Sequence, residues 1–151
     1  FIKENSKGIP KNLIPYIVRV AQKKLKFLKV FGKNYKTKDG TGVRDYIHVM
    51  DLADGHISAL EHLMKSESQL INLNLGTGLG TSVLELVNVF EKVNNVRIPL
   101  EFGSRRTGDC SKVIADNSLA LSLLGWSPKR SIEEMCIDGW KWQTLNPNGY
   151  E

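Results

Sequence analysis

Three arginines stand where they could bind an anion. Arg44 lies within residues 43–49, a run that predicts a strand, while Arg105 and Arg106 follow a second predicted strand and precede Asp109. Guanidinium groups match phosphate oxygens through two parallel hydrogen bonds, and loops at strand ends often hold ligands. The spacing favours a diphosphate ligand, although an ion pair such as Arg106 with Asp109 explains it equally well.

A glycine-rich turn at residues 76–80 is a second possible ligand site. An apolar run precedes it and a predicted helix follows it, as in loops that bind dinucleotides through backbone N–H groups. The match is incomplete, because Thr81 stands where a third glycine is expected. The acidic residue expected about twenty positions later is represented only by Glu101, at the wrong end of a short strand. We therefore expect a structural turn here, and no cofactor-binding residue in this chain.

Four side chains close in sequence could be considered as metal ligands: His48, Asp51, Asp54 and His56. The two carboxylates share a helix face, but His56 points elsewhere and His48 belongs to a predicted strand. Helix capping and surface positions explain the carboxylates better, so we expect no metal site.

Two catalytic patterns are absent from the sequence. No Gly-x-Ser-x-Gly run supports serine-hydrolase chemistry. No tyrosine is followed four residues later by lysine, a spacing that would place both side chains on one helix face, where the ammonium lowers the phenol pKa. We therefore expect no catalytic residue in this chain.

Composition is that of an ordinary globular domain. The chain has 151 residues, 41% of them hydrophobic and 25% charged, with a net charge of +5. Its length suits one domain with a real core. No apolar run reaches the ~20 residues that cross a bilayer, and no signal peptide is visible, so we expect a cytoplasmic protein without a membrane partner. The positive charge allows an anionic partner, but no recognised motif supports nucleic-acid binding.

Two further features concern the chain ends and the thiols. A start at Phe1 rather than Met indicates a fragment or a processed product. Cys110 and Cys136 fit no metal or redox spacing, so we expect reduced, buried thiols.

Predicted strands alternate with predicted helices, which indicates the α/β class with one small mixed sheet and flanking helices. Apolar runs predict four strands, at residues 27–31, 43–49, 71–75 and 98–102. Apolar periodicity and caps predict five helices, at residues 13–24, 51–64, 82–90, 117–124 and 131–146. The expected caps are Asp51 for the second helix, the capping boxes Ser82–Glu85 and Ser131–Glu134, and a stop at Gly125. One apolar side of the second helix is expected to comprise Ala53, Ile57, Leu60 and Met64.

Several longer motifs resemble one family. They include Gly8-Ile-Pro-Lys-Asn-Leu-Ile-Pro-Tyr16, Asp39-Gly-Thr-Gly-Val-Arg-Asp-Tyr-Ile-His48, Asp51-Leu-Ala-Asp-Gly-His56, Asn74-Leu-Gly-Thr-Gly78, Arg105-Arg-Thr-Gly-Asp109 and Leu124-Gly-Trp126. In this order they resemble the C-terminal part of the UDP-glucose 4-epimerases, along nearly the whole chain. The resemblance implies that residues 1–151 form a single substrate-binding region of an extended short-chain dehydrogenase, a Rossmann-type enzyme whose N-terminal NAD-binding domain is absent from this chain.

That family interconverts UDP-glucose and UDP-galactose, in galactose metabolism, with a tightly held NAD that takes a hydride from the sugar C4 and returns it. By resemblance, Arg44 and Arg106 would bind the diphosphate and Asp109 the ribose. Asn12 and Leu13 would contact the UDP-sugar, and the uracil pocket would be lined, partly through backbone, by Lys29, Val30 and Phe31. Val113 stands where family members commonly carry Tyr or Cys beside the sugar, so we expect tolerance of N-acetylated UDP-sugars in the intact enzyme.

The same resemblance implies that the NAD loop and the catalytic residues belong to the N-terminal half, which would be the partner of this chain, and that the intact enzyme is a homodimer. We expect the isolated chain to be an inactive portion of an isomerase that binds UDP-sugars weakly. The alternatives are a non-catalytic remnant, or a UDP-sugar-binding module that needs its other half in trans.

Overall fold

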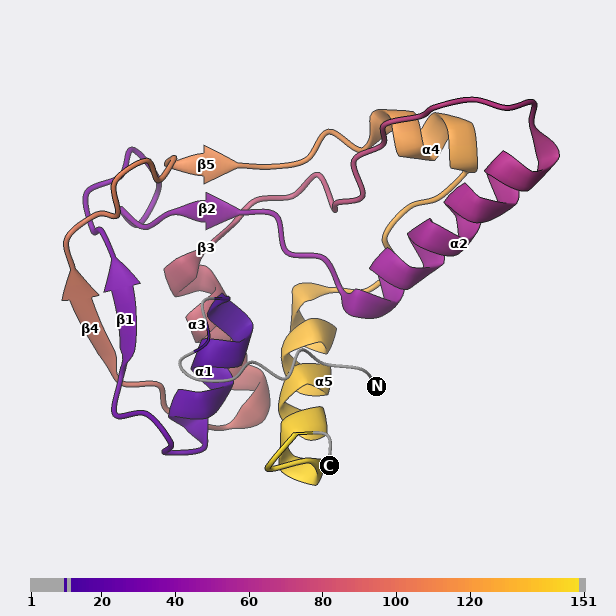
Figure 1. The fold of residues 1–151 in the computed structure, drawn as a ribbon. Coiled ribbons are helices and arrows are strands. Elements are labelled where there is room, and N and C mark those ends of the chain that lie inside the picture. The colour runs from indigo at the N-terminus through magenta and orange to yellow at the C-terminus, as the bar shows by residue number, and fades with distance from the viewer. Residues whose placement is uncertain (1–9, 11, 150–151) are drawn as a thin grey trace.

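The computed structural model describes residues 10 and 12–149 as a mixed α/β fold, which confirms the predicted class (Figure 1). Its elements are α1 (Leu13–Ala21), β1 (Leu28–Phe31), β2 (Val43–Arg44), α2 (Val49–Lys65), β3 (Thr81–Ser82), α3 (Val83–Asn94), β4 (Leu100–Gly103), β5 (Lys112–Val113), α4 (Ser118–Leu124) and α5 (Ile132–Leu145).

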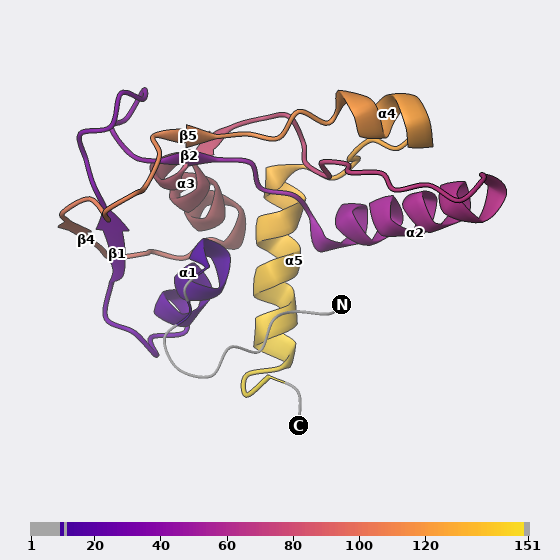
Figure 2. The same cartoon turned by 45° about the horizontal axis from the view of Figure 1, so that its top comes forward.

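The hydrophobic core lies between α1, α3, α5 and the β1–β4 pair (Figures 1 and 2). Its fully buried members come from α1, β1, α3 and α5 and include Ile17, Val18, Leu28, Val30, Leu86, Val87, Phe90 and Cys136. Phe90 meets Trp140 edge to face, with ring centroids 6.1 Å apart. The apolar stripes predicted for α1 and α3 are therefore buried in one core, and this core supports the strands that carry the candidate site.

The strands form two small sheets rather than the single sheet predicted. β1 pairs in parallel with β4, from Leu28 opposite Leu100 to Phe31 opposite Gly103. β2 lies between antiparallel β3 and parallel β5. The two-residue strands β3 and β5 were not predicted, because so short a pairing leaves no apolar periodicity.

The strand predicted for residues 43–49 is only two residues long, because two polar side chains end it. The Asp45 carboxylate turns to the 76–80 loop, where it accepts from the backbone N–H groups of Thr77 and Gly78. His48 caps α2, its Nδ1 accepting from Met50 N at 3.1 Å. The prediction of Asp51 as this cap was wrong, and the helix begins two residues earlier.

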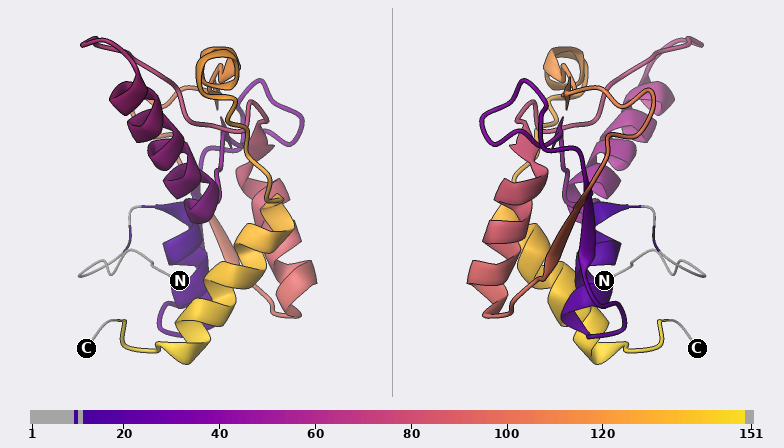
Figure 3. Two further views of the ribbon diagram at one scale, coloured as in Figure 1. Left: turned by 90° about the vertical axis from the view of Figure 1, so that its right-hand side faces the viewer. Right: turned by 90° about the vertical axis from the view of Figure 1, so that its left-hand side faces the viewer.

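The strand predicted at residues 71–75 is an extended segment without a strand partner in the described part of the chain. It follows α2, which with α4 reaches away from the α1–α3–α5 group (Figure 3). The predicted apolar side of α2 is not core: Ile57, Leu60 and Met64 are exposed. The expectation that both thiols are buried was wrong for Cys110, which is exposed, although neither cysteine forms a disulfide.

The predicted capping boxes are both present. In each, the serine Oγ accepts from the N–H of the glutamate three residues on, and the glutamate accepts from the serine N–H. Gly125 ends α4 in the left-handed conformation, as predicted. α1 stops at Ala21 rather than near Lys24, since Lys23 has a positive φ of 60°.

No helix within residues 10 and 12–149 combines the length and apolar character needed to span a membrane. No three His, Cys, Asp or Glu side chains in that part of the chain come together as a possible metal site.

Candidate functional site

A cavity of about 290 Å³ lies between the start of α1, strands β1 and β2, and the loop after β4. It brings together eight of the nine residues predicted to bind a UDP-sugar: Asn12, Leu13, Lys29, Val30, Phe31, Arg44, Arg106 and Asp109. These residues come from four segments spread over nearly a hundred positions, so the fold itself assembles the set.

Arg44 and Asp109 form the charged centre of this cavity. Arg44 Nη2 lies 2.8 Å from Asp109 Oδ1, and both side chains are about one-third exposed. Arg44 Nη1 also donates to the carbonyl oxygens of Val43, at 2.8 Å, and Cys110, at 3.0 Å. The Arg106–Asp109 ion pair considered in the sequence does not form, because Asp109 pairs with Arg44 instead.

Arg106 lies instead above an aromatic ring. Its guanidinium carbon is 3.9 Å from the ring centroid of Phe31, in a cation–π contact. No hydrogen bond or ion pair engages this guanidinium within residues 10 and 12–149, so its N–H donors can still take an anion. Arg105 is differently placed: it donates to Asn34 and lies 4.0 Å above Tyr35.

Val113 is the one predicted residue outside the cavity. It is half exposed and pairs with Arg44 across the parallel β2–β5 ladder. It lines a shallow neighbouring hollow of about 380 Å³, to which Arg44 also contributes. Val113 is therefore beside the arginine, but it lies at the rim rather than in the wall of the cavity.

Five residues of the cavity lining were not predicted: Tyr16, Tyr35, Gly42, Tyr46 and Val83. Strand alternation could have found Tyr46, two residues after Arg44, and helical spacing could have found Tyr16, one turn after Asn12. No sequence signal marks Tyr35, which lies in a loop. Its hydroxyl is buried and finds no hydrogen-bond partner in the described part of the chain.

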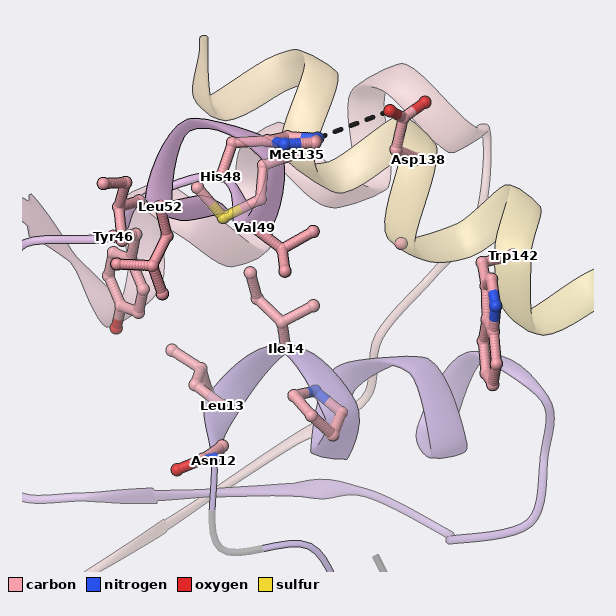
Figure 4. Close-up of a pocket in the computed structure, with 13 residues that line it drawn as sticks. Asn12, Leu13, Ile14, Tyr46, His48, Val49, Leu52, Met135, Asp138 and Trp142 are labelled. Carbon is pink, nitrogen blue, oxygen red and sulfur yellow. Dashed lines mark ion pairs between the residues drawn. The ribbon is translucent and has the colours of Figure 1, made fainter. Parts of the chain in front are cut away.

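Tyr46 also lines a second, mostly apolar cavity of about 490 Å³ between α1, α5 and the start of α2 (Figure 4). At its edge His48 Nε2 lies 3.3 Å from Asp138 Oδ2. Because Nδ1 of this histidine accepts a hydrogen bond from Met50 N, the ring N–H is on Nε2, the nitrogen that faces Asp138. Burial raises the pKa of Tyr46 to about 12, against the opposite effect of the Arg44 charge, so the phenol stays protonated at neutral pH.

Backbone donors of the glycine-rich turn are bonded to a side chain of this chain. The Asp45 carboxylate accepts from Thr77 N at 2.9 Å, Gly78 N at 3.0 Å and Ala115 N at 3.3 Å. A Cβ on Gly76 would lie only 2.5 Å from the Ala115 Cβ, which is why glycine is required there. The carboxylate thus occupies two backbone donors of the turn that an anion would otherwise contact.

The sequence matches the family model of GDP-mannose 4,6 dehydratase over residues 2–138. Among curated proteins it is 54% identical to the UDP-glucose 4-epimerase of Bacillus subtilis, over 99% of this chain and 44% of that protein. It is 50% identical to the enzyme of the same name from Dictyostelium discoideum, over 99% of this chain and 43% of that protein.

Solved structures agree with these matches. The UDP-glucose 4-epimerase of Stenotrophomonas maltophila, solved with NAD and formylated UDP-arabinopyranose, is 49% identical with a TM-score of 0.93, over 97% of this chain and 43% of that one. The enzyme from Bifidobacterium longum, solved with NAD+ and UDP, is 46% identical with a TM-score of 0.90, over 95% of this chain and 42% of that one. This chain thus spans less than half the length of its relatives.

The family model matches most of the chain, and the epimerases agree with it in both sequence and fold. The chain therefore belongs to the GDP-mannose 4,6 dehydratase family and corresponds to a C-terminal portion of its UDP-glucose 4-epimerase members.

Proposed function

We propose that this chain is the UDP-sugar-binding portion of a UDP-glucose 4-epimerase. The intact enzyme would interconvert UDP-glucose and UDP-galactose through transient NAD-dependent oxidation at the sugar C4. One observation carries the proposal: a single cavity gathers Arg44, Arg106 and Asp109 beside the Phe31 ring. Two guanidinium groups next to an aromatic ring suit a diphosphate joined to a planar base.

In this proposal Arg106 and Arg44 bind the diphosphate. The guanidinium N–H donors of Arg106 make no hydrogen bond to the described residues and are available to the phosphates. The Asp109 carboxylate holds Arg44 at the cavity and leaves its side chain about one-third exposed. The second carboxylate oxygen of Asp109 can accept from a ribose hydroxyl.

The uracil would lie along β1. Within the described residues this strand pairs on one edge, with β4, so backbone groups at its other edge can bond the base at Lys29 and Val30. Phe31 offers its ring, and Asn12 and Leu13 close the cavity from the start of α1. Val113 would border the sugar from the rim, where a small side chain leaves room for an N-acetyl group.

The redox chemistry would belong to another portion. No tyrosine here is followed four residues later by lysine, and Asp45 occupies the glycine-rich turn. We infer that an N-terminal half holds NAD and the catalytic residues, that the intact enzyme is a cytoplasmic homodimer, and that the isolated chain has no epimerase activity. A UDP-sugar-binding module that needs its other half in trans fits the same cavity, whereas a decayed remnant would have no reason to keep it.

Calorimetry with UDP tests the proposal on the chain as it stands. UDP should bind, and Arg106→Ala should weaken binding by about 1.5–3 kcal/mol, the value of a hydrogen bond to a charged group. Arg97→Ala is the matched control, because it removes the same charge from a side chain that is 90% exposed and outside the cavity. A folded chain that binds no UDP, or an equal loss in both variants, would refute the proposal.

A further inference from the structure

A second polar hollow lies at the carboxyl ends of strands β1 and β4. The two strands run in parallel, so their last residues, Phe31 and Gly103, lie opposite each other at one end of the pair (Figure 1). The hollow measures about 540 Å³ and is lined by Gly32, Lys33, Asn34, Gly103, Ser104 and Arg105. These residues all differ from those that line the 290 Å³ cavity. Carboxyl ends of parallel strands are where α/β folds bind ligands.

Two glycines keep part of the hollow free of side chains. Gly32 N donates to Gly103 O at 3.0 Å, which extends the β1–β4 ladder by one bond. Gly32 has a φ of +86°, and a Cβ there would lie 2.6 Å from the ring of Tyr35 and 2.8 Å from Cγ of Arg105. A Cβ on Gly103 would lie 2.9 Å from Cε of Lys29. Neither position accepts a side chain without displacing its neighbours, so bare backbone faces a ligand here.

Two cations line the hollow without a counter-ion. Arg105 is held by Asn34, whose Oδ1 accepts from Nε at 2.8 Å and whose carbonyl oxygen accepts from Nη2, and its guanidinium lies 4.0 Å above the ring of Tyr35. Nη1 of this arginine stays without a partner among the described residues. Lys33 Nζ lies 4.7 Å from the ring centroid of Phe102 and pairs with no described carboxylate. The lining contains no acidic side chain, so an anion would meet no repulsion there.

The loops that line the hollow also carry unpaired backbone donors. The N–H groups of Lys33, Asn34, Ser104 and Arg105 donate to no atom within residues 10 and 12–149. Unpaired N–H groups of successive residues are the donors that anion-binding loops use. Donors therefore outnumber free acceptors in this part of the chain, which suits a ligand that brings acceptors only.

We propose that this hollow binds a phosphate group, either free phosphate or the phosphate end of a small polar ester. The proposal goes beyond the UDP-sugar cavity and does not depend on it. Arg105 offers a planar guanidinium, Lys33 a second charge and Ser104 a hydroxyl, and phosphate oxygens accept from all three. No aromatic or aliphatic side chain is in the lining, so a nucleotide base would find no stacking surface. The ester would therefore be a phosphorylated polyol or sugar.

NMR spectra of the backbone amides of the isotope-labelled chain test the site, because they report on the hollow and the cavity separately. The probes are sodium phosphate and glycerol 3-phosphate, each added at constant ionic strength. Amides of residues 33–34 and 104–105 should shift and saturate, with a Kd on the order of 1 mM because solvent screens exposed cations. Tighter binding of the ester would identify a phosphorylated polyol as the ligand, and equal binding would identify free phosphate.

Lys33→Ala and Arg105→Ala should each weaken phosphate binding about tenfold or more, the value of one hydrogen bond to a charged group. Lys36→Ala is the matched control and should leave the affinity unchanged, because Lys36 is an exposed lysine of the same loop outside both linings. If Arg105→Ala loses the fold with its contact to Tyr35, Lys33→Ala decides alone, since Lys33 is exposed.

Shifts that never saturate, or that sodium chloride reproduces without phosphate, would overturn the site, since charge screening would explain them. An equal loss of affinity in Lys36→Ala would overturn it as well. UDP titration separates this site from the proposed function, because UDP should shift the amides of Arg44 and Arg106 in the cavity. Phosphate binding in the hollow without UDP binding in the cavity overturns the proposed function alone. The reverse result overturns the phosphate site alone.

Discussion

Asp51 anchors the arm formed by α2 to the loop before α5, and replacing it with asparagine should destabilise the fold. The carboxylate is 1% exposed. Its Oδ2 accepts from the backbone N–H groups of Lys129, at 3.0 Å, and Arg130, at 2.8 Å. Its Oδ1 pairs with the guanidinium of Arg130. Trp126 Nε1 donates to the backbone oxygen of the same residue at 3.1 Å, so the whole connection converges on one position.

Asparagine keeps the shape but replaces one of the two acceptor oxygens with an NH2 donor. With its oxygen toward the two backbone amides, its NH2 group faces the Arg130 guanidinium. Turned over, it leaves the amides without an acceptor. Either way at least one charge-assisted contact is lost, at about 1.5–3 kcal/mol, and a buried donor is left unpaired. We expect Asp51→Asn to cost about 3 kcal/mol, or roughly 6–12 °C in Tm for a domain of this size.

Urea and thermal unfolding at pH 7 measure this cost. Asp54→Asn is the matched control on the same helix, because Asp54 is 46% exposed and only 3.4 Å from the same guanidinium. An exposed pair of this kind is worth about 0–1 kcal/mol. Equal effects of the two variants would show that burial of Asp51 does not set the energy of the anchor, and the reasoning would be wrong.

Three further predictions concern acid, packing and thiols. Burial would raise the pKa of Asp51, but its hydrogen bonds with Arg130 and Lys129 outweigh burial and hold the pKa below its ordinary value of 3.8. The stabilisation by Asp51 is therefore complete above the ordinary pKa and is lost as pH falls through the pKa of the folded state. Acid unfolding monitored by circular dichroism measures this loss. Phe90→Ala should cost about 3–5 kcal/mol in urea unfolding, since a fully buried ring is removed. A thiol reagent should modify exposed Cys110 quickly, while Cys136 reacts only on unfolding, because burial raises its pKa to about 12.

The helices and their caps could be predicted because their signals are local. Ser82 and Glu85 are three residues apart, and each satisfies the backbone of the other without help from distant parts of the chain. The helix cap at His48 was missed for a specific reason. Its imidazole acts as the acceptor that Asp, Ser or Asn usually supply, and a strand pattern of alternating residues ran through the same position.

Strand pairing could not be predicted, because no periodicity records which segment lies beside which. Residues 112–113 become a strand only because β2 lies beside them. The cavity shows the same limit. The arginines were recognisable by type, but the choice of Arg44 over Arg106 as the partner of Asp109 depends on how the loop after β4 folds back over β2. Tyr35 reaches the cavity from a loop, where no periodic pattern predicts which way a side chain points.

The two clearest failures of the sequence reasoning have one physical cause. Periodicity predicted burial for the Ile57–Leu60–Met64 side of α2 and for the strand at residues 71–75, and in the structure the helix side is exposed and the strand unpaired. Elsewhere in the chain the same rules predicted burial correctly, as for Leu86 and Phe90 in α3. Apolar periodicity reflects the environment in which a sequence works, and along this side of α2 and residues 71–75 the described residues supply neither cover for the helix side nor a strand partner.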